Sequence, residues 1–139
     1  MNDVLLAIHF IGLMMGAGGG FGSAIVARVA AKKTPEQAAP LRALGPVMAR
    51  VSHIGLAILW LTGAILIWTA YGGPAQLPQL FWIKAIFIVS LTGAAIATEL
   101  TYAEIKAGKV GAAARLPKIG PVAGLSALLA TTVAAFAFH

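Results

Sequence analysis

The chain has 139 residues, enough for one domain. Hydrophobic residues make up 60% and charged residues only 10%, whereas a soluble domain usually carries about 25% charged residues, so the composition excludes an ordinary water-soluble fold. The net charge of +6 does not indicate nucleic-acid binding, because the basic residues gather between apolar segments, and the lack of cysteine excludes disulfides, thiolate metal sites and iron–sulfur clusters.

Four apolar segments follow one another along the chain, at residues 4–26, 51–71, 80–102 and 119–138. Each has about the 20 residues that a helix needs to cross the hydrocarbon core of a membrane. Too few polar residues remain to cover four such helices in water. The sequence therefore predicts an all-α fold, a single integral membrane domain over residues 1–139 that forms a four-helix transmembrane bundle.

The first segment combines a histidine with an unusual density of glycine. At 3.6 residues per turn, His9 shares a helix face with Gly12, Gly16 and Gly20, and small residues at this spacing allow another helix backbone or a flat ligand to approach closely. We expect this segment not to be a cleaved signal peptide, since Asp3 precedes it and the basic residues follow it.

The loops between the apolar segments predict the topology. Loop 27–50 is rich in basic residues and is broken by prolines, with room for a short helix; loop 72–79 has no charge; loop 103–118 is again basic. The positive-inside rule places the two basic loops in the cytoplasm and both termini outside, and the aromatic residues beside the uncharged loop fit an outer aromatic belt. We expect a multi-pass protein of a bacterial-type inner (plasma) membrane.

This topology assigns the polar residues of the spans to two depths. His9 and Lys84 fall at nearly the same level in the outer half, whereas His53 and Glu99 fall near the inner side, at the level of Arg28 and Arg50. The helical rise separates His9 from His53 by roughly 20 Å, so the two imidazoles cannot bind one haem iron within a subunit.

Each of these residues has a structural and a functional interpretation. His9 is a hydrogen-bonded core histidine or a cofactor ligand or proton carrier, and Lys84 extends to the outer headgroups or faces the bundle interior. His53 either pairs with Glu99 in a structural role or relays protons with it, and Glu99 has Arg50 and Arg28 as other possible partners. The glycines pack helices or contact a porphyrin plane. No catalytic triad, carboxylate pair or metal-ligand cluster is present in the sequence, so redox chemistry would require a bound cofactor.

A histidine in Ile8-His9-Phe10 and a lysine in Phe81-Trp82-Ile83-Lys84, within four spans, resemble the HemJ-type protoporphyrinogen IX oxidase family and related small four-helix haem-binding membrane proteins. The resemblance implies one haem b per subunit, with His9 and Lys84 as iron ligands, and an oxidoreductase or electron-transfer role linked to protoporphyrinogen oxidation. Gly16 is then a candidate for cofactor contact, and His53 with Glu99 for a proton relay.

Two questions stay open at this stage. The small-residue face of the first segment favours a homodimer in the lipid, with an unknown electron partner. The main alternative function is a cofactor-free small transporter or channel subunit with a polar path through the bundle, and a purely structural membrane component is the third.

Overall fold

The computed structural model describes residues 2–137, and its regular elements within that range are helices alone. Four long helices, α1 (Asn2–Ala30), α2 (Pro35–Thr69), α3 (Gln79–Lys106) and α4 (Leu116–Ala137), are joined with two short 3₁₀ turns, η1 (Pro74–Gln76) and η2 (Ala112–Arg115). All four are long and apolar enough to cross a membrane. The predicted all-α, four-span architecture is confirmed at this level; residue 138 of the fourth predicted span and His139 lie outside the described residues.

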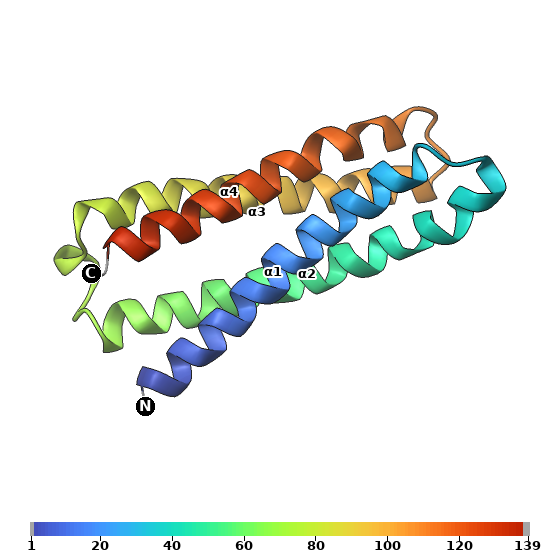
Figure 1. Cartoon of the computed structure of the whole chain (residues 1–139). Coiled ribbons are helices and arrows are strands. Elements are labelled where there is room, and N and C mark those ends of the chain that lie inside the picture. The colour runs from blue at the N-terminus through green and yellow to red at the C-terminus, as the bar shows by residue number, and fades with distance from the viewer. Residues whose placement is uncertain (1, 138–139) are drawn as a thin grey trace.

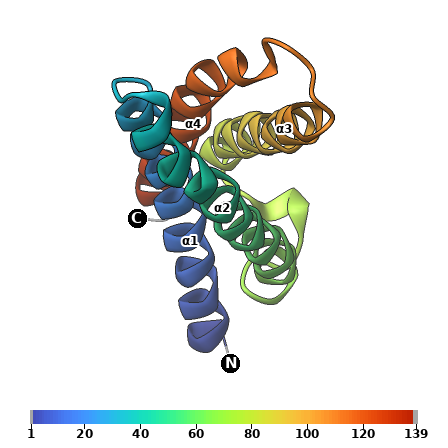
Figure 2. The same cartoon turned by 90° about the vertical axis from the view of Figure 1, so that its right-hand side faces the viewer.

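The helices form two antiparallel hairpins that lean on each other (Figure 1). The contact is most extensive within the pairs α1–α2 and α3–α4, smaller between α1 and α4, and slight between α2 and α3. Figure 2 shows the same pairing along the bundle, with α1 crossing α2. The start of α1, the end of α4 and the α2–α3 connection lie at one end of the bundle, and the two basic connections lie at the other.

The first connection is much shorter than the predicted loop over residues 27–50. α1 continues to Ala30 and α2 begins already at Pro35, so Pro40 and Pro46 lie inside a 35-residue helix. A proline at the first position of a helix costs no hydrogen bond, and each internal proline removes one. Packing outweighs this loss, because the small residues Ala38, Gly45 and Ala49 of the same stretch are buried.

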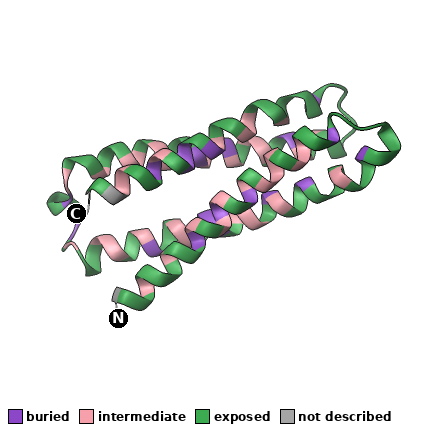
Figure 3. Ribbon diagram, viewed as in Figure 1, coloured by how far each residue is buried: buried purple, intermediate pink, exposed green. Residues whose placement is uncertain are grey.

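Little of the surface is buried, and the buried residues are mostly small (Figure 3). The core cluster consists of Leu56, Leu91 and Ala127. Large apolar side chains stand on the outside instead; Phe10 is 52% exposed and Trp68 67% exposed. In water such a surface would aggregate, whereas hydrocarbon solvates it.

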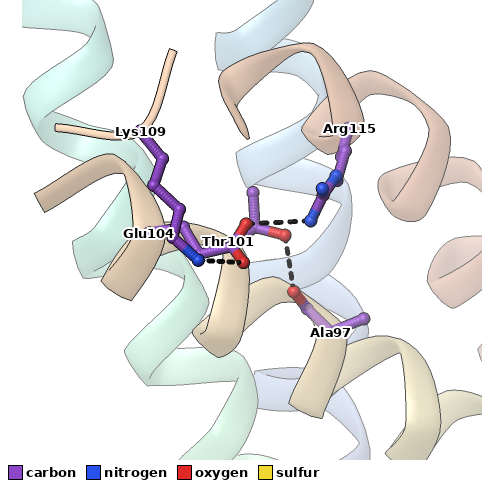
Figure 4. A network of polar contacts seen from close by, with 5 residues as sticks. All are labelled: Ala97, Thr101, Glu104, Lys109 and Arg115. Atoms are coloured by element: carbon purple, nitrogen blue, oxygen red, sulfur yellow. Dashed lines mark hydrogen bonds and ion pairs between the residues drawn. The ribbon is translucent and has the colours of Figure 1, made fainter. Parts of the chain in front are cut away.

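A polar network closes the turn between α3 and α4 (Figure 4). The Glu104 carboxylate accepts hydrogen bonds from Lys109 Nζ at 3.1 Å and from Arg115 Nη1 at 2.8 Å. The turn itself passes through Gly111, whose φ of 84° is readily available only to glycine. This network holds part of the basic loop 103–118 against the end of the bundle.

Candidate functional site

His9 lies at the interface of α1 and α2, where Thr62 holds one of its ring nitrogens. His9 Nδ1 is 2.8 Å from Thr62 Oγ1, and the Thr62 hydroxyl itself donates to the Ile58 carbonyl oxygen at 2.6 Å. A hydroxyl has a single proton to donate, so in this pair Nδ1 must carry the hydrogen and donate it to Thr62. The neutral imidazole then keeps a lone pair on Nε2.

Glycine on both helices allows this close approach. A Cβ atom on Gly12 would lie 2.8 Å from the Ile58 side chain, and one on Gly19 would lie 2.7 Å from the Met48 carbonyl oxygen. On α2, a Cβ on Gly55 would collide with the backbone nitrogen of Gly16. The backbones of α1 and α2 are therefore in contact along the small-residue face, as the helix-packing interpretation of these glycines predicts.

The contacts between α1 and α2 also concern two predictions, the cofactor contact at Gly16 and the homodimer through the glycine face. Gly16 is buried against α2, and its carbonyl oxygen accepts a hydrogen bond of 2.8 Å from Ser52 Oγ. The glycine face that favoured a homodimer is thus covered by α2 of the same chain, so a dimer would need another surface. A cofactor contact at Gly16 stays a prediction.

Lys84 lies on α3 near the same end of the bundle as His9. Its Nζ lies 6.0 Å from the centre of the Phe81 ring. Phe81 packs edge-to-face on Trp82, with ring centres 5.8 Å apart. Half-buried rather than fully exposed, Lys84 does not stand free on the lipid surface.

His53 differs from His9 in that both of its ring nitrogens have partners. Nε2 is 3.1 Å from the Ala95 carbonyl oxygen, and Nδ1 is 2.7 Å from Glu99 Oε1. The structure therefore selects His53 as the partner of Glu99 from the three partners that the sequence left open. Since a carbonyl oxygen only accepts, Nε2 carries a hydrogen, and one further proton lies between Nδ1 and the carboxyl group.

The two histidines occupy different levels of the bundle. His9 contacts α2 at Thr62, and the rise from His53 to Thr62 along the helix is about 14 Å. The separation of the two histidines along the bundle is therefore smaller than the roughly 20 Å that we expected from the predicted ends of the apolar segments. The glycine contacts, and not those ends, set the register between α1 and α2. A single haem iron still cannot reach both imidazoles.

His53 lines two hollows at once. The first is a cavity of about 50 Å³ between all four helices, whose polar lining includes Ser23, Ser52, His53, Thr98 and Tyr102. The second is a groove of about 310 Å³ between α2 and α3, lined by His53, Leu56, Thr92, Ala95, Ile96, Glu99 and Leu100. A cavity of the first size holds water and no larger cofactor.

Sequence reasoning missed Thr62 as a functional residue. Its signal was available, because Thr62 is a lone hydroxyl within the apolar run Leu59-Trp60-Leu61-Thr62-Gly63. Thr92 was missed likewise: its hydroxyl accepts a hydrogen bond of 3.0 Å from Trp60 Nε1 and joins α3 to α2. A hydroxyl in an apolar run shows only that some polar partner exists, and its identity depends on the helix register.

Among residues 2–137, no group of three or more His, Cys, Asp or Glu side chains could hold a bare metal ion. Comparison with known proteins adds no relative, as neither a family model nor a curated protein nor a solved structure matches the chain. The features that bear on function are therefore the surroundings of His9 and of the His53–Glu99 pair.

Proposed function

We propose that this chain is a multi-pass protein of a bacterial-type plasma membrane that binds one b-type haem through His9. The termini and the His9 level face outward, and the basic connections face the cytoplasm. The proposed role is electron transfer, linked to protoporphyrinogen oxidation in the manner that the HemJ-type resemblance implies.

One observation carries the proposal, namely the hydrogen bond from His9 Nδ1 to Thr62. Histidines that ligate a metal usually donate their other ring N–H to a fixed acceptor, which sets the tautomer and orients the ring. The hydroxyl of Thr62 is fixed in turn by its bond to Ile58. His9 is thus held as a neutral imidazole with its lone pair on Nε2, which is the form that binds haem iron.

Lys84 is the proposed second ligand. Like His9, it lies on the first turns of a helix that begins at this end of the bundle, and an amine binds iron in its neutral form. The α2–α3 contact is slight, so these two helices can part at the His9 end of the bundle to admit the porphyrin, while the α1–α2 interface and the His53–Glu99 pair stay in place. When bound, haem supplies one-electron chemistry that none of the side chains can perform.

The inner level has a separate task in this proposal. His53 and Glu99 hold a shared proton, and His53 lies beside a cavity whose polar lining suits water, so the pair can relay protons from the cytoplasm. They are not expected to touch the haem.

The test is the absorption spectrum of purified protein from cells supplied with haem. Wild type is expected to show a Soret band that His9→Ala removes. His53→Ala is the matched control, since it deletes the other intramembrane imidazole and should leave the band in place. A colourless wild type, or a band that survives His9→Ala and disappears in His53→Ala, would overturn the assignment.

The cofactor-free transporter remains the second candidate, because His53 lines both the internal cavity and the groove. It predicts colourless protein that moves a solute or protons across the membrane of proteoliposomes. Transport by haem-free protein, abolished by Glu99→Gln, would favour this candidate.

A further inference from the structure

The end of the bundle that holds the α1–α2 and α3–α4 connections is strongly basic. Of the ten Lys and Arg residues, all but Lys84 lie towards this end, whereas Asp3, one of the four acidic residues, lies at the other. The remaining acidic groups are bonded already: Glu99 pairs with His53, Glu104 pairs with Lys109 and Arg115, and Glu36 accepts from Thr34 and from its own backbone N–H. This leaves positive charge at the basic end that no acidic side chain of the described residues balances.

Two of the basic residues, Arg42 on α2 and Lys106 on α3, lie at one level of the α2–α3 interface. The Tyr102 hydroxyl rests on Gly45, where an added Cβ atom would lie 2.6 Å from Oη. Arg42 precedes Gly45 by three residues, and Lys106 follows Tyr102 by four, and helical residues at these spacings share a face. Since α2 and α3 run antiparallel, both residues lie about one turn beyond this contact, on the sides of the two helices that face each other.

The level of these two residues is that of the lipid headgroups. α3 ends at Lys106, and the 35 residues of α2 span about 50 Å, so the first turns of α2 extend beyond a hydrocarbon core of about 30 Å. Both Arg42 and Lys106 are exposed. Two positive charges that face each other here repel, and an anion between them would remove that repulsion.

The membrane supplies such an anion as the phosphate group of its lipids. A guanidinium group binds phosphate through two parallel hydrogen bonds, and an ammonium group adds a point charge. Basic side chains between transmembrane helices bind the headgroups of acidic phospholipids in this way. A zwitterionic lipid fits less well, because its own ammonium group would meet two further positive charges.

We propose that Arg42 and Lys106 bind the phosphate of one anionic phospholipid of the phosphatidylglycerol type, whose acyl chains extend into the hydrocarbon. The site lies apart from the residues of the proposed function, since Arg42 and His53 are separated by about 16 Å along α2. Binding requires neither haem nor the His53–Glu99 pair. Loss of haem binding would therefore leave the lipid site intact, and the reverse holds as well.

Native mass spectrometry of the full chain, released from detergent after titration with phosphatidylglycerol, measures this affinity directly. Wild type is expected to bind one phosphatidylglycerol saturably, and phosphatidylcholine with the same acyl chains about tenfold more weakly. Arg42→Gln and Lys106→Gln should each raise the Kd about fivefold, which corresponds to about 1 kcal/mol for a basic residue near an acidic lipid. The double variant should raise the Kd roughly twentyfold, because both charges contact one phosphate.

Matched variants separate this site from the general charge of the basic end. Arg28→Gln on α1 and Lys118→Gln on α4 remove the same two side chains from exposed positions outside the α2–α3 interface, and should leave the Kd unchanged. Arg42→Lys keeps the charge and loses the paired hydrogen bonds, so it should bind more weakly than wild type and more tightly than Arg42→Gln. All these positions are exposed, so the variants are expected to fold.

Three results would overturn the inference. An equal loss of affinity in all four glutamine variants would mean that the lipid is attracted by the basic end as a whole. Equal binding of phosphatidylcholine and phosphatidylglycerol would mean that the acyl chains, and not the phosphate charge, hold the lipid. Displacement of phosphatidylglycerol by the same concentration of glycerol 3-phosphate would show that the site takes a soluble anion instead of a membrane lipid.

Discussion

The two histidines within the apolar helices, His9 and His53, differ in the hydrogen bonds that their ring nitrogens make. In His9, Nδ1 donates a hydrogen bond to Thr62 and the lone pair stays on Nε2. In His53, Nε2 bonds the Ala95 carbonyl oxygen and Nδ1 bonds Glu99. A histidine with a free lone pair can ligate a metal, and a histidine bonded at both nitrogens can hold or pass a proton. The difference lies in the neighbours that each helix register supplies.

The two interfaces that hold these histidines also differ. α1 and α2 touch backbone to backbone through glycine, so His9 sits on a closely packed surface. α2 and α3 make slight contact and leave a groove, and the two helices are joined by polar contacts of His53 with Ala95 and Glu99 and of Trp60 with Thr92. Tight packing suits a ligand that must be oriented, and an open groove suits a group that meets molecules from the lipid.

The largest effect is expected from breaking the α1–α2 interface with Gly55→Val. A Cβ there would lie 2.6 Å from the Gly12 carbonyl oxygen, so α1 must move away from α2 and from Thr62. We expect a loss of about 3 kcal/mol in unfolding free energy, typical of strong overpacking, together with loss of the Soret band. Gly18→Val, with no atom within 4 Å of the added Cβ, is the control in thermal unfolding. Equal stability of the two variants would contradict the interface described.

Lys84→Ala tests the second haem ligand. It should shift the Soret band and lower haem affinity by more than the roughly tenfold loss typical of an outer-shell change, because a direct ligand is removed. Lys84→Arg should not restore the wild-type spectrum, since a guanidinium group stays protonated and cannot ligate. An unchanged spectrum in both variants would exclude Lys84 as a ligand.

Thr62→Val tests the bond that gives His9 its tautomer. Valine keeps the shape and removes the acceptor, so haem affinity should fall about tenfold while the band persists. Thr62→Ser retains a hydroxyl and should bind haem as wild type does. The same haem titration of both variants decides the matter, and equal affinities would mean that Thr62 does not orient His9.

The smallest effect on haem binding is expected at the inner level. His53→Ala removes two hydrogen bonds, to Glu99 and to the Ala95 carbonyl oxygen, and should cost about 2 kcal/mol in unfolding free energy, at about 1 kcal/mol for each bond. The orphaned carboxyl group should then be protonated in lipid, which infrared spectroscopy detects as a carboxylic-acid C=O band that disappears on adding Glu99→Gln. Arg50→Gln is the control, because in the structure Arg50 is not the ion-pair partner of Glu99.

The number and type of the helices could be predicted from the sequence, but the positions of the helix ends could not. Four apolar runs of membrane length predict four helices because the backbone must satisfy its hydrogen bonds internally in lipid. The break predicted at Pro35, Pro40 and Pro46 was wrong for the last two, because burial of Ala38, Gly45 and Ala49 compensates for the hydrogen bonds that the prolines remove.

The sequence by itself determined which residues are polar within the apolar segments and how far apart they lie along the helices, because helical rise converts sequence separation into distance along the axis. It therefore separated His9 from His53 and grouped His53 with Glu99. Only the tertiary structure decided what each nitrogen bonds to. That choice depends on a register of a few ångströms between neighbouring helices, which glycine contacts set through backbone collisions, and no single-helix pattern contains that information.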